Sequence, residues 1–104
     1  MEYNLLVRDK IPEIIRRNGE RPVIHIAGEE EYWDRLGDKL VEEVKKFLKN
    51  QKDEEMGDIF EMLTTINKIK GWSIEQILEI QKKKREERGG FDKRIILERV
   101  DKNE

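Results

Sequence analysis

The sequence predicts a mostly α-helical protein, an antiparallel helix bundle of all-α type with short peripheral β-strands. Two long segments place apolar residues three and four positions apart, which is typical of one helical stripe. Glycine and proline residues stand where these and the shorter helices are expected to begin or end. A chain of 104 residues, 36% hydrophobic and 44% charged, has room for one small core. We therefore expect a single domain over residues 1–104, with a frayed tail at 101–104.

The N-terminal part predicts a strand, a helix and a second strand. Tyr3–Val7 is a short apolar run and is the first strand candidate. Pro12 suits the first turn of a helix, because its missing N–H costs nothing there. The helix is expected over Ile11–Asn18 and ends at Gly19. Arg21–Ile26 is rich in β-branched residues and is the second strand candidate.

Two long helices are expected over Glu29–Lys49 and Asp53–Lys70. Residues 50–52 form a short polar turn between them, so the two helices should pack antiparallel. Their apolar stripes are Trp33, Leu36, Leu40, Val44 and Phe47 in the first, and Met56, Ile59, Phe60, Leu63 and Ile66 in the second.

A fourth helix should begin at Ser73, which forms a capping box with Gln76 three residues later. Gly89 and Gly90 should end it. The apolar run Arg94–Val100 is the last strand candidate and would pair with the earlier strand over residues 21–26.

Composition limits the classes of partner. The formal net charge is −2, so the chain lacks the broad basic field with which proteins bind duplex nucleic acid. It has no cysteine, which excludes disulfides and thiolate metal sites. Residues 1–7 are too short and polar for a signal peptide, and no apolar run could cross a bilayer. We expect a cytoplasmic protein that binds neither nucleic acid nor membrane.

Four acids on the two long helices predict a metal site. Counted from Gln51, Glu43 lies about eight residues before the centre of the turn and Asp58 about seven after it, so antiparallel helices would bring these two positions face to face. Glu42 shares the helical side of Glu43, and Glu55 is the i, i+3 neighbour of Asp58. Like charges in one place are costly without a cation, and oxygen ligands favour Mg²⁺ or Mn²⁺. The alternative is structural: acids in a first helical turn suit the helix dipole, and Glu42 would face solvent.

A basic run closes the fourth helix, where Lys82 and Lys83 are followed by Lys84, Arg85 and Arg88. One interpretation is a phosphate clamp, which Arg8 and Lys10 would extend. The other is a solvated helix end whose cations complement the dipole.

The remaining residues that often carry chemistry have simpler explanations. His25 is best explained as a surface residue, and Trp33 and Trp72 as core or interface residues.

Three segments together resemble MazG-related nucleoside triphosphate pyrophosphohydrolases. They are LLVRDKIPEII near the N-terminus, KLVEEVKKFL with its EEMGD partner, and KKKREERGGFDKRIIL near the C-terminus. The small phosphoribosyl-ATP-pyrophosphohydrolase-like branch, thought to destroy noncanonical nucleotides, is the most similar. The resemblance covers residues 3–98.

The resemblance implies an all-α fold, a homodimer and a set of metal ligands. Glu42 and Glu43 match the first two acids of the family's E-E-x-x-E motif, and Glu55 and Asp58 match its E-x-x-D motif. The third acid of the first motif falls on Lys46, which is a departure. It implies fewer metals, direct contact of Lys46 with phosphate, or impaired catalysis.

The implied reaction is Mg²⁺-dependent hydrolysis of a nucleoside triphosphate, a noncanonical one in the branch named above, to monophosphate and pyrophosphate. Glu42 or Glu43 would accept the proton of the attacking water. The residues implied to bind substrate phosphates are Arg8, Lys10, Lys46, Lys84, Arg85 and Arg88. Two alternatives stay open, a noncatalytic dimeric nucleotide- or partner-binding module, and a phosphoribosyl-ATP pyrophosphohydrolase.

Overall fold

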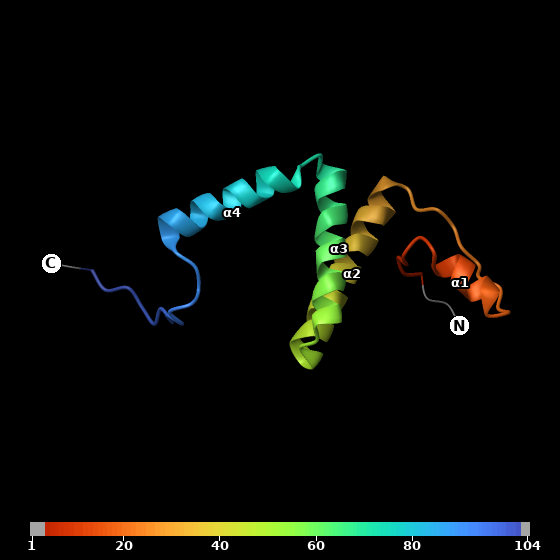
Figure 1. Ribbon diagram of the computed structural model, residues 1–104, viewed down its shortest axis with the longest axis horizontal. Coiled ribbons are helices and arrows are strands. Elements are labelled where there is room, and N and C mark those ends of the chain that lie inside the picture. The colour runs from red at the N-terminus through yellow and green to blue at the C-terminus, as the bar shows by residue number, and fades with distance from the viewer. Residues whose placement is uncertain (1–3, 103–104) are drawn as a thin grey trace. The chain divides into compact units, whose positions relative to one another are not determined.

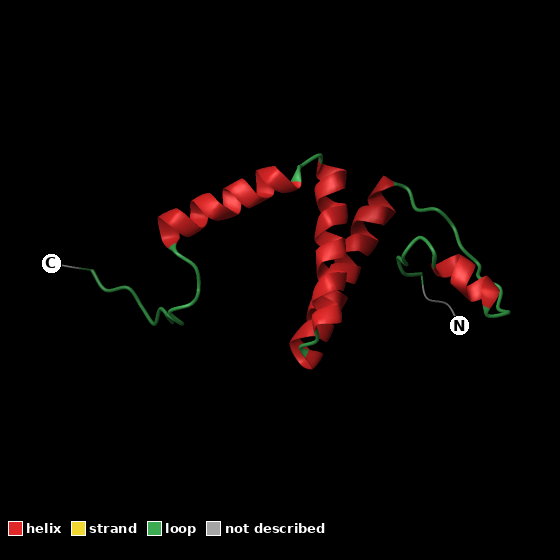
Figure 2. Ribbon diagram, viewed as in Figure 1, coloured by secondary structure: helices red, strands yellow, loops and turns green. Residues whose placement is uncertain are grey.

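The computed structural model describes residues 4–102, and its regular secondary structure there is entirely helical (Figures 1 and 2). The helices of this part of the chain are α1 (Ile11–Arg17), α2 (Glu29–Asn50), α3 (Asp53–Lys70) and α4 (Ile74–Arg88). The mostly α-helical class is therefore confirmed, and each predicted helix is present with its ends within one residue of the expected positions.

The turn between α2 and α3 shows why the long helices end where they do. Gln51 adopts the left-handed conformation, with φ of 55°, and its N–H donates to the Phe47 carbonyl at 2.7 Å. Glu55 then accepts from the Lys52 N–H at 3.2 Å and from the Asn50 side-chain amide at 2.9 Å. The chain reverses direction within this turn (Figure 1). The antiparallel packing of α2 and α3 along their whole length stays a prediction.

The capping box of α4 is confirmed. The Gln76 N–H donates to the Ser73 hydroxyl at 3.1 Å, and the Ser73 N–H donates to the Gln76 side-chain oxygen, also at 3.1 Å. At the other end Gly89 has φ of 83° and its N–H donates to the Arg85 carbonyl at 2.8 Å. This N–H satisfies a helix-end carbonyl, and glycine adopts the positive φ without steric cost because it has no Cβ.

The predicted strands are wrong for the described residues. Residues 4–7, Arg21–Ile26 and Arg94–Val100 have no strand structure (Figure 2), and Tyr3 lies outside the described part. A β-branched run favours extended backbone, but a strand forms only where a neighbouring strand pairs its N–H and C=O groups. Val23 is 92% exposed, so this segment also lacks the apolar contact that would hold it in a sheet.

The chain divides into two compact units, Met1–Ile66 and Asn67–Glu104, with the division inside α3. In residues 4–102 the buried residues, Leu36 and Glu43, both lie on α2 in the first unit. In the second unit α4 and the segment after it are almost wholly exposed. None of the helices in the described part combines the length and apolar character needed to cross a membrane.

Candidate functional site

Glu43 is the most unusual acid of the first unit, because it is buried. Only 5% of the residue is exposed, in the middle of α2. Lys39, one turn earlier, lies 3.7 Å from its Oε1, and Lys46, one turn later, lies 3.7 Å from the same atom. Burial of a carboxylate is costly unless it is paired, so these two ammonium groups are what allow Glu43 to be buried.

Lys46 joins Glu43 to its neighbour Glu42. The Lys46 Nζ lies 3.3 Å from the Glu42 Oε1, and both side chains are about half exposed. The hydrogen bond with Glu42, followed by the negative charges of Glu43 and Glu42, raises the pKa of Lys46 above its ordinary value. Lys46 therefore acts as the counter-ion of Glu42 and Glu43.

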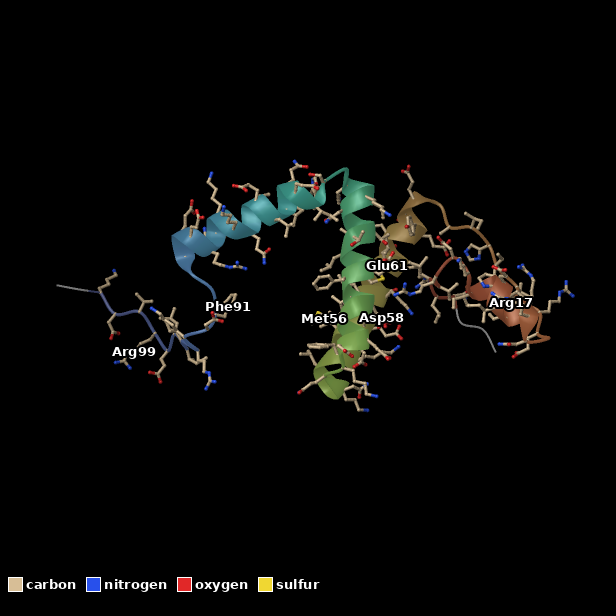
Figure 3. All side chains as sticks on the ribbon, in the orientation of Figure 1. Arg17, Met56, Asp58, Glu61, Phe91 and Arg99 are labelled. Atoms are coloured by element: carbon tan, nitrogen blue, oxygen red, sulfur yellow. The ribbon has the colours of Figure 1, made fainter. Side chains whose placement is uncertain are left out.

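Asp58 of α3 is held by a residue far away in the sequence. The Arg8 guanidinium, in the segment before α1, donates to the Asp58 Oδ1 at 2.7 Å. Asp58 and Glu61 lie along one edge of α3, whereas Met56 lies on the other (Figure 3). The sequence places Arg8 among phosphate-binding candidates, whereas the structure gives it a carboxylate partner.

The four predicted metal ligands all belong to the first unit, and each has a partner within the chain. Glu55 accepts hydrogen bonds at the turn, and Asp58 forms an ion pair with Arg8. Glu42 and Glu43 form ion pairs with lysines of α2. In the part of the chain that the structure describes, no three acid or histidine side chains lie close enough to share a metal ion. The oxygen donors suit Mg²⁺ in kind, but their arrangement is not a formed metal site, which stays a prediction.

A pocket of about 170 Å³ is lined in part by Glu42. Its lining also includes two cations, Arg35 and Lys39, that the sequence did not single out. Arg35 bonds to Asp38 at 3.2 Å, and Lys39 pairs with Glu43. The signal for Lys39 was available, because it stands four residues before Glu43 on the same helical side. The pocket is lined by Asn4, Leu5, Leu6, Arg35, Asp38, Lys39 and Glu42.

A larger open hollow of about 500 Å³ lies at the start of α2 and is lined mainly by acids of the helix's first turn. His25 lies near this turn in sequence, is exposed, and has its Nε2 2.9 Å from the Glu31 Oε1. This agrees with its interpretation as a surface residue.

The basic candidates are divided between the two units. Lys84, Arg85 and Arg88 are exposed on α4 in the second unit, and Lys10 is exposed just before α1 in the first. Their convergence with the acids on one substrate is therefore still a prediction.

Comparison with known proteins adds one local similarity. An uncharacterized protein of Mycolicibacterium smegmatis (strain ATCC 700084 / mc(2)155) is 56% identical over 39 residues. The match covers 38% of this chain and 40% of that protein, so its activity does not transfer to this chain. No family model matches the chain, and no solved structure matches it.

Proposed function

We propose that this chain is a Mg²⁺-dependent nucleoside triphosphate pyrophosphohydrolase, which cleaves between the α and β phosphates to release a monophosphate and pyrophosphate. The observation that carries the proposal is buried Glu43, bracketed by Lys39 and Lys46. Acids are rarely buried in proteins unless they are paired, so a carboxylate buried between two cations is a candidate for a functional role. The resemblance of the acidic and GGF segments to MazG-related enzymes supplies the reaction class.

The chain's own side chains can be assigned roles without a formed metal site. Glu43 or Glu42 would take the proton of the attacking water. The charge of the phosphates would be neutralised by the predicted phosphate-binding residues, which are Arg8, Lys10, Lys46, Lys84, Arg85 and Arg88. Mg²⁺ or Mn²⁺ is proposed as cofactor on donor chemistry, since carboxylate oxygens are its preferred ligands. Because internal ion pairs and hydrogen bonds now satisfy these carboxylates, a metal ion would have to compete with those partners. We place this reaction in the cytoplasm and take damaged nucleotides as the first substrates to test.

The test is release of pyrophosphate from a panel of canonical and damaged triphosphates in the presence of Mg²⁺. The wild-type chain should release it from at least one, and Glu43→Gln should lower the rate by roughly hundredfold, the usual order for loss of an acid–base group. Glu79→Gln, which removes an exposed acid of α4, is the matched control and should leave the rate unchanged. Absence of release across the panel would reject the proposal.

A second function is favoured by the ion pairs of Lys46 with Glu42 and Glu43. If this lysine neutralises the acids permanently, the chain is a noncatalytic module that binds nucleotide without hydrolysis. Calorimetric binding of a nucleotide, together with no pyrophosphate release, is the result that this alternative requires.

We also propose that the chain acts as a homodimer. In the described residues Leu36 is the fully buried apolar side chain, while Val41, Leu48 and Phe60 on the long helices are exposed. One chain therefore leaves apolar surface that a second copy would cover, as helix bundles require. Light scattering at micromolar concentration should give twice the 12.5 kDa chain mass, and the monomer mass would contradict the proposal.

A further inference from the structure

Helix α2 has a second face, which the described chain leaves uncovered. Gly37, Val41 and Leu48 fall within about 40° of one another around the helix, at about 100° per residue. Val41 is 54% exposed, Leu48 is 66% exposed, and Gly37 is exposed as well. The buried residues of α2, Leu36 and Glu43, lie about a third of a turn away from this face. The helix therefore has one covered face and one uncovered face.

Gly37 stands at the centre of the uncovered face, inside a helix of 22 residues. Glycine is less favourable than alanine in a helix interior. A Cβ atom at this position would meet nothing within 4 Å, so packing within the described chain does not require a glycine here. Because glycine has no side chain, it lets another backbone approach closely. Gly37 therefore fits a helix that crosses α2 from outside the chain.

Two charged residues beside this face indicate which helix that is. Asp34 and Lys45 lie within about 20° of each other around α2. Both are exposed, and neither forms an ion pair in the described residues. They are separated by about 16 Å along the helix, so they cannot pair within one chain. An antiparallel second copy of α2 would bring each beside its opposite charge, whereas a parallel copy in the same register would bring like charges together.

We propose that α2 packs antiparallel against α2 of a second copy through this face. Gly37 of each copy lies near Val41 of the other, and Asp34 of each pairs with Lys45 of the other. The face is self-complementary, as a contact across a two-fold axis requires. This inference rests on the homodimer proposed above and names its contact surface and orientation. It does not depend on the reaction that the chain catalyses.

The orientation can be tested by crosslinking, because the chain has no cysteine and introduced thiols have no background. Asp34→Cys and Lys45→Cys chains are mixed and treated with a thiol crosslinker of about 8–10 Å, the separation of packed helix axes. The mixture should give a covalent dimer at several times the yield of either variant alone, since antiparallel packing sets identical positions about 16 Å apart along the helices. Lys68→Cys on α3, mixed with Asp34→Cys, is the control and should give the low yield.

The close approach at Gly37 can be tested by adding a side chain there. Gly37→Gln should raise the dimer dissociation constant by about tenfold or more, because the new side chain has to be accommodated where the helices cross. Sedimentation over a range of concentrations measures this constant, and circular dichroism should show that the helices are retained. Gly57→Gln makes the same change at an exposed glycine of α3 that also has open space for a Cβ atom, and should leave the constant unchanged.

Efficient crosslinking of Asp34→Cys to itself, or a mixture no better than the single variants, would overturn the antiparallel contact. Equal weakening by Gly37→Gln and Gly57→Gln would overturn the crossing at Gly37. A wild-type chain that stays monomeric at micromolar concentration would reject the homodimer together with this contact. None of these results bears on pyrophosphate release, so the proposed reaction stands or falls by its own assay.

Discussion

Helices α2 and α4 are both long and highly charged, but they differ in how far their side chains are buried. Helix α2 buries Leu36 and Glu43 and pairs its acids with its own lysines. Helix α4 has no buried residue, and its cations project into solvent. The two helices also differ in patterning, since α2 has a continuous apolar stripe, whereas the apolar residues of α4 stop before its basic final turns. In the described residues, the buried acid Glu43 lies on the helix that has the continuous apolar stripe.

The largest expected effect tests whether burial on α2 stabilises the protein more than the exposed surface of α4 does. Leu36→Ala should destabilise the protein by about 2–5 kcal/mol, since it removes a fully buried side chain and leaves a cavity. The same substitution on α4, Leu78→Ala, should cost far less because that leucine is half exposed. Urea denaturation followed by circular dichroism measures both. Equal losses of unfolding free energy would show that the two leucines contribute alike to stability.

A second prediction concerns the charge pattern of α2. Lys46→Glu should increase Mg²⁺ affinity, because it adds a third carboxylate beside Glu42 and Glu43. It should also lower turnover by roughly hundredfold, if the ammonium stabilises phosphate charge as the proposed function implies. Calorimetry and the pyrophosphate assay measure the two effects.

The control for this prediction is Lys68→Glu on α3, which makes the same charge change on an exposed helix surface outside the predicted site. An inactive wild-type protein beside an active Lys46→Glu variant would instead identify Lys46 as the cause of lost catalysis.

A smaller effect is expected for the cap of α4. Ser73→Ala should destabilise the helix by about 1 kcal/mol, since it removes the acceptor for the Gln76 N–H. The loss should appear in the helical circular dichroism signal before the main unfolding transition if α4 is held mainly by local interactions. Loss of the whole signal in one transition would show that α4 folds together with α2.

The smallest effect is a pH dependence at Lys46. Its pKa is raised in the folded state by the hydrogen bond with Glu42 and by the charges of Glu43 and Glu42. The stabilisation is therefore complete below the unfolded value of about 10.4, and is lost as the pH rises through the higher folded value. Above about pH 10.4 the wild-type melting temperature should fall more steeply than that of Lys46→Met. Lys45→Met, outside these ion pairs, should keep the wild-type slope.

The limits of the helices were predictable because local chemistry sets them. Pro12, the Ser73–Gln76 capping box and Gly89 act through backbone geometry and hydrogen bonds within a few residues. The strands were not predictable in this way. The run at Arg21–Ile26 has the right residues for a strand, but a strand also needs a partner, which the local sequence does not supply.

For the candidate site, the sequence by itself determined which acids and cations the chain possesses and which share a helical side. Spacing alone placed Lys46 beside Glu43, because residues three apart are neighbours on any helix. Only the tertiary structure decided that Glu43 is buried while Glu42 is exposed, and that Arg8 binds Asp58. Burial and long-range pairing depend on how separate segments meet in space, and helical periodicity carries no information about that contact.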